Sequence, residues 1–448
     1  MRVLCEAMPL VSAFGTDFAA RPPQCGERGS NFGMDVAAAR GSTAMKSALS
    51  FLVAARECEI GELEQLAVTS ELVSLVGRLI HALQKERGIS NVFLGSQGKR
   101  FGEQRAPQAL ECDELARQVR ERFDELYSGP HSVRNGARLF ARIAAVLHGL
   151  DELPGLRERI GARTLGADES TEAFARLISG LLAVVFEAAD SASDPQVSRA
   201  LVAMFNFMQG KEFAGRERAF GAMVFVGGRV DDCEQRWQQL IDTQERCFQV
   251  FTNFADPAAL QAWSAQRNGP KLAELDRLRQ VGRSARERAA LDPRLGQDWY
   301  DCCTHRIDAM RKVEDTLASH LRALCERRIE QTRAELRDQQ AILATLSHPS
   351  GPQTTAPIGP QLERSILDML QEQSSRLQAM SDELDTVRAS LNERKVVERA
   401  KGLLMVARTL SEDAAYKVLR EAAMNQSRRL VDVAERIVEA HELLGPKA

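Results

Sequence analysis

The apolar residues of this chain recur at helical spacing through most of its length. From about Glu59 onward they stand three and four residues apart, as in Leu72, Val76, Leu79 and Leu83, which is typical of an amphipathic helix. Pro and Gly interrupt the pattern at 128–130, 153–155, 194–195, 268–270 and 292–293, where we expect turns. The pattern predicts an all-α fold, a large bundle with helices over 59–95, 105–127, 133–150, 169–190, 196–226, 230–253, 257–288 and 297–346.

Two segments without this periodicity suggest the domain boundaries. Residues 349–360, PSGPQTTAPIGP, hold four prolines and two glycines, and a helix cannot continue through such a run. Residues 1–58 are predicted to be an N-terminal extension, disordered in part, with the natural translation start at Met34 or Met45 rather than Met1. The predicted organisation is a helical domain at 59–346, a linker at 347–360, a heptad helix at 361–391 and a three-helix module at 392–448.

A heptad repeat follows the linker. Its apolar positions are Leu370, Leu377, Leu384 and Leu391, with Ile366, Met380 and Val387 four residues before three of them. Such a seam is stable only when it is buried against another helix. The partner is either the same helix in a second subunit or part of the bundle. We favour the first alternative and predict a coiled coil that forms a homodimer or a higher homo-oligomer.

Composition narrows the class of protein. Only 5% of the 448 residues are aromatic and the net charge is −3, which argues against a large sheet. No apolar run approaches the roughly 20 residues of a membrane span. The nine cysteines are scattered apart from Cys302-Cys303, as expected of reduced thiols in the cytoplasm. Because motifs of hydrolases, P-loop enzymes, zinc proteases and zinc sites are missing, we predict no enzyme, no catalytic residue, no metal and no cofactor.

The C-terminal module is basic although the whole chain is acidic. Residues 394–436 contain ten Lys or Arg and six Asp or Glu, a net charge of +4, and one tyrosine, Tyr416. Cationic side chains neutralise phosphates and an aromatic ring can stack on an unpaired base, so the module suits RNA. On charge alone, solvated faces of a small helical bundle are the commoner explanation.

The sequences RKVVERAKGLLM and LSEDAAYKVLREAAMNQSRRLVDVAERIV, within residues 394–438, resemble the ANTAR domain. That resemblance implies three helices that bind paired hairpins in leader mRNA and prevent transcription termination, with RNA polymerase affected only indirectly. The RNA-binding residues that it implies by position are Lys401, Tyr416, Arg420 and the stretch from Asn425 to Arg429, which includes Arg428. From the basic charge of the module we add Arg394, Lys395 and Lys417 as candidates.

Two stretches of the large bundle place charges inside apolar helices, QKERGIS at 84–90 and QGKEFAGRERA at 209–219. A buried arginine there needs an anionic partner. One alternative is an internal carboxylate, from Glu86, Glu212 or Glu217. The other is a bound planar oxyanion, which a guanidinium can hold by two parallel N–H···O bonds. Chemistry alone favours the internal salt bridge.

With WYDCCTHRIDAMRKVED at 299–315, the motifs KERGIS and KEFAGRERA resemble in order and spacing the NIT domain, an all-helical nitrate- and nitrite-sensing module. The resemblance runs from near residue 70 to near 320 and implies nitrate or nitrite as the ligand. The ligand arginines that it implies are Arg87 and Arg218, with Arg279 or Arg277 as a third. Arg306 matches a family motif, but pairing with Asp308 or Glu314 is an alternative for it.

NIT followed by a linker and ANTAR is the order found in soluble nitrate-responsive antiterminators. We therefore predict a cytoplasmic regulator of nitrate-assimilation genes that does not bind membranes. Two alternatives stay open. The RNA-binding module could respond to another small anion or to a protein partner, and nitrate-independent antitermination would favour that. The chain could also be a signalling adaptor that acts through the heptad helix without RNA.

Overall fold

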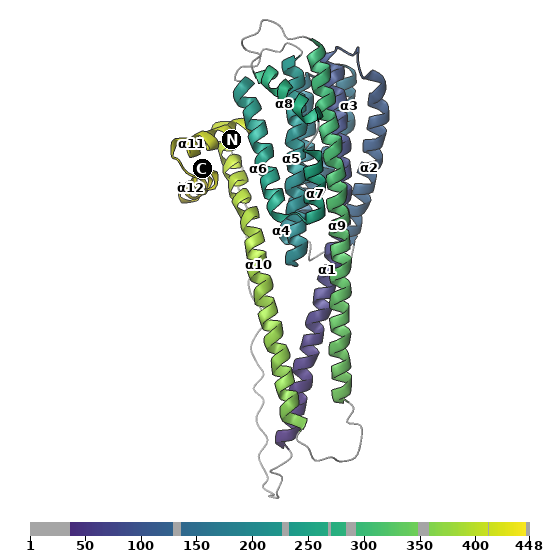
Figure 1. Ribbon diagram of the computed structural model, residues 1–448, viewed down its shortest axis with the longest axis vertical. Coiled ribbons are helices and arrows are strands. Elements are labelled where there is room, and N and C mark those ends of the chain that lie inside the picture. The colour runs from purple at the N-terminus through teal and green to yellow at the C-terminus, as the bar shows by residue number, and fades with distance from the viewer. Residues whose placement is uncertain are drawn as a thin grey trace, which may run out of the picture. The chain divides into compact units, whose positions relative to one another are not determined.

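The computed structural model describes residues 36–128, 136–225, 233–267, 270–283, 293–347, 358–410 and 412–444. Within these ranges it contains twelve helices and no strand (Figure 1), which confirms the all-α prediction. Residues 49–448 form one compact unit. The helices are α1 (Val36–Gly95), α2 (Gly102–Ser128), α3 (Gly136–Gly161), α4 (Ala167–Ser191), α5 (Pro195–Phe225), α6 (Cys233–Phe254), α7 (Pro257–Gln266), α8 (Pro270–Arg283), α9 (Pro293–Ser347), α10 (Ile358–Arg408), α11 (Glu412–Asn425) and α12 (Leu430–Leu444).

Helix α5 is the central element of the large bundle, with its most extensive contacts to α6 and α9. It begins as the sequence predicts. Asp194 Oδ1 accepts hydrogen bonds from the backbone N–H groups two and three residues on, each at 3.0 Å, and Pro195 suits the first turn because its missing N–H has no intrahelical role there. Because α5 is buried on nearly all sides, its charged residues need partners inside the bundle. The fully buried ones are Lys211, Glu212, Glu217 and Arg218.

Two predictions about turns and helices are wrong. Helix α3 runs through the turn expected at 153–155, with Pro154 inside it. The stripe of Leu150, Leu153 and Ile160 is buried, and this packing outweighs the hydrogen bond that a proline removes. The range 257–288, expected as one helix although a turn was also expected at 268–270, is divided into α7, which ends at Gln266, and α8, which begins at Pro270.

The long helices cross several of the predicted boundaries. Helix α1 begins at Val36 and α10 at Ile358, so helix extends into the expected extension and into the end of the expected linker. Pro360 lies in the first turn of α10, where a proline is tolerated. Helix α10 continues unbroken to Arg408, across the boundary expected after residue 391. Residues 1–35, including Met34, and residues 348–357 of the expected linker lie outside the described residues.

The heptad seam is divided between two environments. Val387 and Leu391 are each 1% exposed and belong to the core of the large bundle. At these two positions the bundle covers the seam, and the expectation that a helix of a second subunit covers it is wrong. Leu370 and Leu377 are 38% and 56% exposed. Arg376, between them, forms ion pairs with carboxylates of α1 and α9 at 2.8 and 2.6 Å. The intrachain packing therefore covers one end of the seam and leaves leucines of the other end exposed.

One helix within the described residues is long and apolar enough to cross a membrane, contrary to the expectation that none is. It is the Ser50–Gly95 part of α1, with a mean hydropathy of 1.4 over its most apolar 18-residue window. In that window 67% is buried inside the structure. Leu72, Leu79 and Leu83 lie in the bundle core, so the apolar character of α1 reflects packing against other helices.

Candidate functional site

Arg87, on α1, is buried against a carboxylate of α5. The side chain is 1% exposed, and its Nη1 and Nη2 donate to Glu212 Oε1 and Oε2 at 2.6 and 3.1 Å. Burial lowers the pKa of Arg87, and the carboxylate opposes that change. Among the described residues, Arg87 Nε has no hydrogen-bond partner. The Glu212 carboxylate therefore occupies Nη1 and Nη2 of Arg87, while the buried Nε donor remains unpaired.

Arg218, on α5, is 2% exposed and makes a different set of contacts. Its Nη2 donates to the backbone oxygen of Gln84 at 2.8 Å, and its Nη1 donates to Thr304 Oγ1 at 3.0 Å. The guanidinium carbon lies 5.1 Å from the centre of the Tyr300 ring. Both acceptors are neutral, so these hydrogen bonds do not cancel the positive charge. The charge of Arg218 in turn lowers the pKa of Arg87, which indicates that an anion at this position would interact with both.

Two glycines let these arginines pack closely between α1 and α5. A Cβ on Gly215 of α5 would stand 2.4 Å from Arg87 Nη2. A Cβ on Gly88 of α1 would stand 2.6 Å from Arg218 Nη2. Each helix thus presents bare backbone to the arginine that comes from the other helix. The positions of both guanidinium groups therefore depend on the glycines.

Replacing Gly215 by Ala is expected to displace the Arg87 guanidinium and to destabilise the protein by about 1–3 kcal/mol, because the added methyl group overpacks a filled site. Thermal denaturation would measure this. Gly155→Ala in α3 is the matched control, since a Cβ there meets nothing within 4 Å and Ala favours a helix by up to about 1 kcal/mol. Equal melting temperatures for the Gly215→Ala variant and the wild type would contradict the proposed packing role.

A second buried ion pair lies one and a half turns further along α5. Glu217 accepts hydrogen bonds from Arg279 Nε and Nη2 of α8 at 2.7 and 2.8 Å. It also accepts from Trp237 Nε1 and Gln244 Nε2. Burial opposes ionisation of Glu217, but the charge and hydrogen bonds of Arg279 hold its pKa below the usual value. In this structure Arg279 is therefore engaged by a carboxylate, as Arg87 is.

Arg277 and Arg306 lie in different surroundings. Arg277 is half exposed and pairs with Glu274 at 2.6 Å on the surface of α8, outside the buried cluster. Arg306 lies 3.6 Å from the Glu217 carboxylate, and burial together with the charge of Arg279 lowers its pKa to about 10. The prediction that Arg306 pairs with Asp308 or Glu314 is therefore wrong. Residues two apart on a helix do not face each other.

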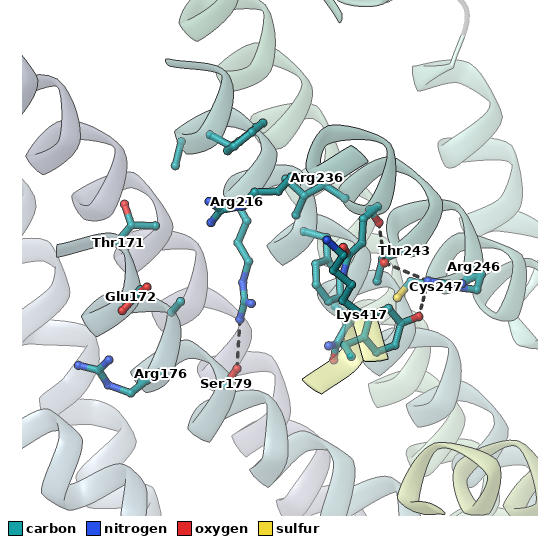
Figure 2. Close-up of a pocket in the computed structure, with 18 of the residues that line it drawn as sticks. Thr171, Glu172, Arg176, Ser179, Arg216, Arg236, Thr243, Arg246, Cys247 and Lys417 are labelled. Carbon is teal, nitrogen blue, oxygen red and sulfur yellow. Dashed lines mark hydrogen bonds between the residues drawn. The ribbon is translucent and has the colours of Figure 1, made fainter. Parts of the chain in front are cut away.

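A basic cavity of about 1590 Å³ is lined by residues of α4, α5 and α6 and of the C-terminal helices. Nine Arg or Lys and four Asp or Glu side chains line it. Figure 2 shows Arg176, Arg216, Arg236 and Arg246 at the wall formed by the large bundle, with Lys417 from α11 near Arg246. Cationic groups from both modules therefore line the same space, which makes it attractive to anions.

Helix α11 contacts α6 at the edge of this cavity. The guanidinium of Arg246 donates to Tyr416 Oη and lies 5.6 Å from the centre of the tyrosine ring. Arg420 Nη2 lies 3.4 Å from the carboxylate of Asp242. Two residues of the C-terminal module with an expected RNA role thus bind the large bundle in this structure.

The comparisons with known proteins cover most of the chain. The family described as nitrate and nitrite sensing, NIT, matches residues 78–322. The chain belongs to the NIT family. The ANTAR domain matches residues 385–438. The chain is 32% identical to the nitrate regulatory protein of Klebsiella oxytoca, over 87% of this chain and 94% of that protein. It also resembles the structure of the NasR transcription antiterminator, with a TM-score of 0.56 and 29% identity over 88% of this chain and 99% of the other.

The NIT match contains all five arginines named as candidate ligands, and this combination of domains is that of a NasR-type regulator. Such proteins are regulatory rather than enzymatic. Among the described residues, no group of three His, Cys, Asp or Glu side chains could hold a metal ion. The buried arginines Arg87 and Arg218 of the NIT domain bond to a carboxylate and to neutral oxygens, respectively.

The residues expected to contact RNA fall into two groups in the ANTAR domain. One group faces the NIT domain. Besides Tyr416 and Arg420, it includes Lys395, which bonds Asp190 at 2.6 Å, and Arg394, which lies 4.7 Å from the Phe205 ring centre. The other group is on the surface or within the module. It consists of Asn425, Arg428 and Arg429, which are exposed, Lys401, which pairs with Glu398, and Lys417, which lines the cavity.

Several residues of the site were not predicted from the sequence. Thr304 and Tyr300 of α9 contact Arg218, and Asp242 and Arg246 of α6 hold the ANTAR domain. Thr304 and Tyr300 lie within the motif at 299–315, so the sequence did single out the segment that contains them. No pattern in the sequence distinguishes the last two from other charged residues on an exposed helix face.

Proposed function

We propose that the protein is a nitrate- or nitrite-responsive antiterminator. Its NIT domain binds the anion between Arg87 and Arg218, and its ANTAR domain binds paired hairpins in leader mRNA, so that transcription of nitrate-assimilation genes continues. The main observation that supports this ligand site is the pair of buried arginines contributed by α1 and α5. The names of the related nitrate regulatory protein and NasR antiterminator support the same function.

Nitrate suits these arginines for a physical reason. It is planar and carries a single negative charge, and a guanidinium presents planar pairs of N–H donors. Arg218 bonds only to neutral acceptors in the contacts described above, and Arg87 has an unpaired buried Nε. Nitrite shares the planar geometry and the charge. Both anions therefore fit.

Contacts with α6 restrain the ANTAR domain in this structure. Tyr416 and Arg420 are held by α6, so this part of the RNA-binding surface cannot reach RNA. A ligand shifts such an equilibrium only through its different affinity for the two states. Anion binding at α1 and α5 favours a helix packing in which α6 releases α11. RNA polymerase is affected only indirectly, through the folding of the transcript.

The protein acts in the cytoplasm, where the transcripts are made, and without a membrane. Leu370 and Leu377 of α10 remain exposed in one chain, and a repeating apolar seam of this kind is stable when another helix covers it. A second copy of α10 supplies that helix in a homodimer. Sedimentation of the full chain at several concentrations tests this assembly.

Isothermal titration of nitrate tests the ligand site. We expect the wild type to bind, and we expect Arg87→Ala and Arg218→Ala each to weaken binding about tenfold or more, since each removes charged hydrogen bonds to the anion. Arg277→Ala is the control, because this arginine lies at the surface and pairs with Glu274. Equal affinity in all four proteins would contradict the assignment of the site.

A further inference from the structure

Glu212 is the most heavily engaged group beside the proposed anion site. It is 1% exposed and its two oxygens accept four hydrogen bonds. Two come from Arg87, one from Gln84 Nε2 at 2.9 Å and one from Arg216 Nε at 3.0 Å. Burial opposes its ionisation, but the charges of Arg87 and Arg216 hold its pKa below the usual value. It is therefore a carboxylate anion at neutral pH.

The carboxylate of Glu212 resembles nitrate in the features that a guanidinium recognises. Both are planar monoanions whose oxygens can accept two parallel N–H···O bonds. An arginine offers such pairs along two edges, one formed by Nη1 and Nη2 and the other by Nε and Nη2. Glu212 Oε2 already accepts from Nη2, in the longer of its two bonds to Arg87. The Nη1–Nη2 edge, where both nitrogens already bond to Glu212, opens to nitrate only if Glu212 leaves it. The Nε–Nη2 edge uses the second N–H of Nη2, and α5 packs closely on Nη2 at Gly215.

A second arginine is already in place for the displaced carboxylate. Arg216 stands one turn after Glu212 on α5 and bonds to it in the present state. Its side chain extends along the wall of the basic cavity, where Nη2 donates to Ser179 Oγ at 3.3 Å (Figure 2). A rotation of Glu212 toward Arg216 keeps the buried carboxylate paired with a cation, so the exchange does not leave an isolated charge.

We propose that Glu212 is an internal competitor for nitrate: it occupies the Nη1–Nη2 edge of Arg87 in this structure, and the anion binds by displacing it toward Arg216. This inference rests on the proposed nitrate function and adds to it the residue that sets the affinity. Breaking the Arg87–Glu212 pair costs free energy, so the net free energy of nitrate binding is less favourable by that amount. The same step moves negative charge toward the cavity that the ANTAR domain borders.

Titration of nitrate into the Glu212→Gln variant tests this proposal. Because an uncharged amide competes poorly for a guanidinium, we expect nitrate to bind this variant about tenfold or more tightly than the wild type. Glu314→Gln is the matched control. Glu314 is also 1% exposed and pairs with buried Lys211, but it makes no bond to Arg87, so its loss is expected to leave nitrate affinity near the wild-type value.

The outcomes separate this inference from the function on which it rests. No nitrate binding by the wild type overturns both. Binding by the wild type, with equal or weaker affinity in Glu212→Gln, overturns only the competitor role. If the Gln variant does not fold, Glu212→Asp replaces it, because its shorter carboxylate retains the charge but reaches Arg87 less well. We then expect tighter nitrate binding and a larger nitrate-induced rise in melting temperature than in the wild type, and equal values would overturn the proposal.

Discussion

Replacing Glu217 by Ala is expected to lower the free energy of unfolding by about 3–5 kcal/mol, the cost of removing one member of a buried ion pair. Glu217 is 1% exposed and is bonded by Arg279, with Arg306 3.6 Å away. Without the carboxylate, Arg279 is left with the exposed Asp276 and Arg306 with the neutral Gln244 Oε1. Trp237 and Gln244 also lose their acceptor.

Urea denaturation followed by circular dichroism measures this effect. Glu274→Ala provides the control, because Glu274 pairs with Arg277 on the surface of the neighbouring helix α8, and exposed pairs contribute little to stability. Equal unfolding midpoints for the two variants would show that the buried pair is unimportant. The pKa of Glu217 is lowered from 4.5, so its contribution is present above pH 4.5 and is lost as the pH falls below that value.

Disrupting the contacts between α6 and α11 is expected to increase RNA binding in the absence of nitrate about tenfold. In the Asp242→Lys, Arg246→Ala double variant, the first change replaces attraction to Arg420 by repulsion, and the second removes the hydrogen bond and ring contact to Tyr416. Partly exposed contacts of this kind contribute about 0.5–1 kcal/mol each. Their sum, with the added repulsion, shifts the docking equilibrium by about a factor of ten.

Gel shifts with a leader RNA of two hairpins, without nitrate, measure this increase. Glu245→Lys is the control, since Glu245 is an exposed neighbour on α6. Its substitution raises the net charge by two, whereas the double variant raises it by one. Tighter RNA binding by the double variant therefore cannot arise from charge alone. If the control binds RNA as tightly as the double variant, the contacts to α6 do not restrain the ANTAR domain.

The hydrophobic pattern predicted nearly all helices of the large bundle because periodicity is a local property of each segment. Its errors have physical causes outside that pattern. Helix α3 passes through Pro154 because Leu153 and Ile160 are buried on either side of it. The heptad pattern lies within the single helix α10. Which helix covers it depends on the position of the bundle, and Val387 packs into that bundle.

The sequence by itself determined that the protein is helical, that a sensory module precedes a basic RNA-binding module, and that Arg87 and Arg218 stand in unusual motifs. Only the tertiary structure decided that Glu212 bonds the first arginine, and that Thr304 and the Gln84 carbonyl bond the second. The physical reason is that helical periodicity and short motifs are encoded within one segment. The partner of a buried charge is set by the packing of helices that are distant in the chain.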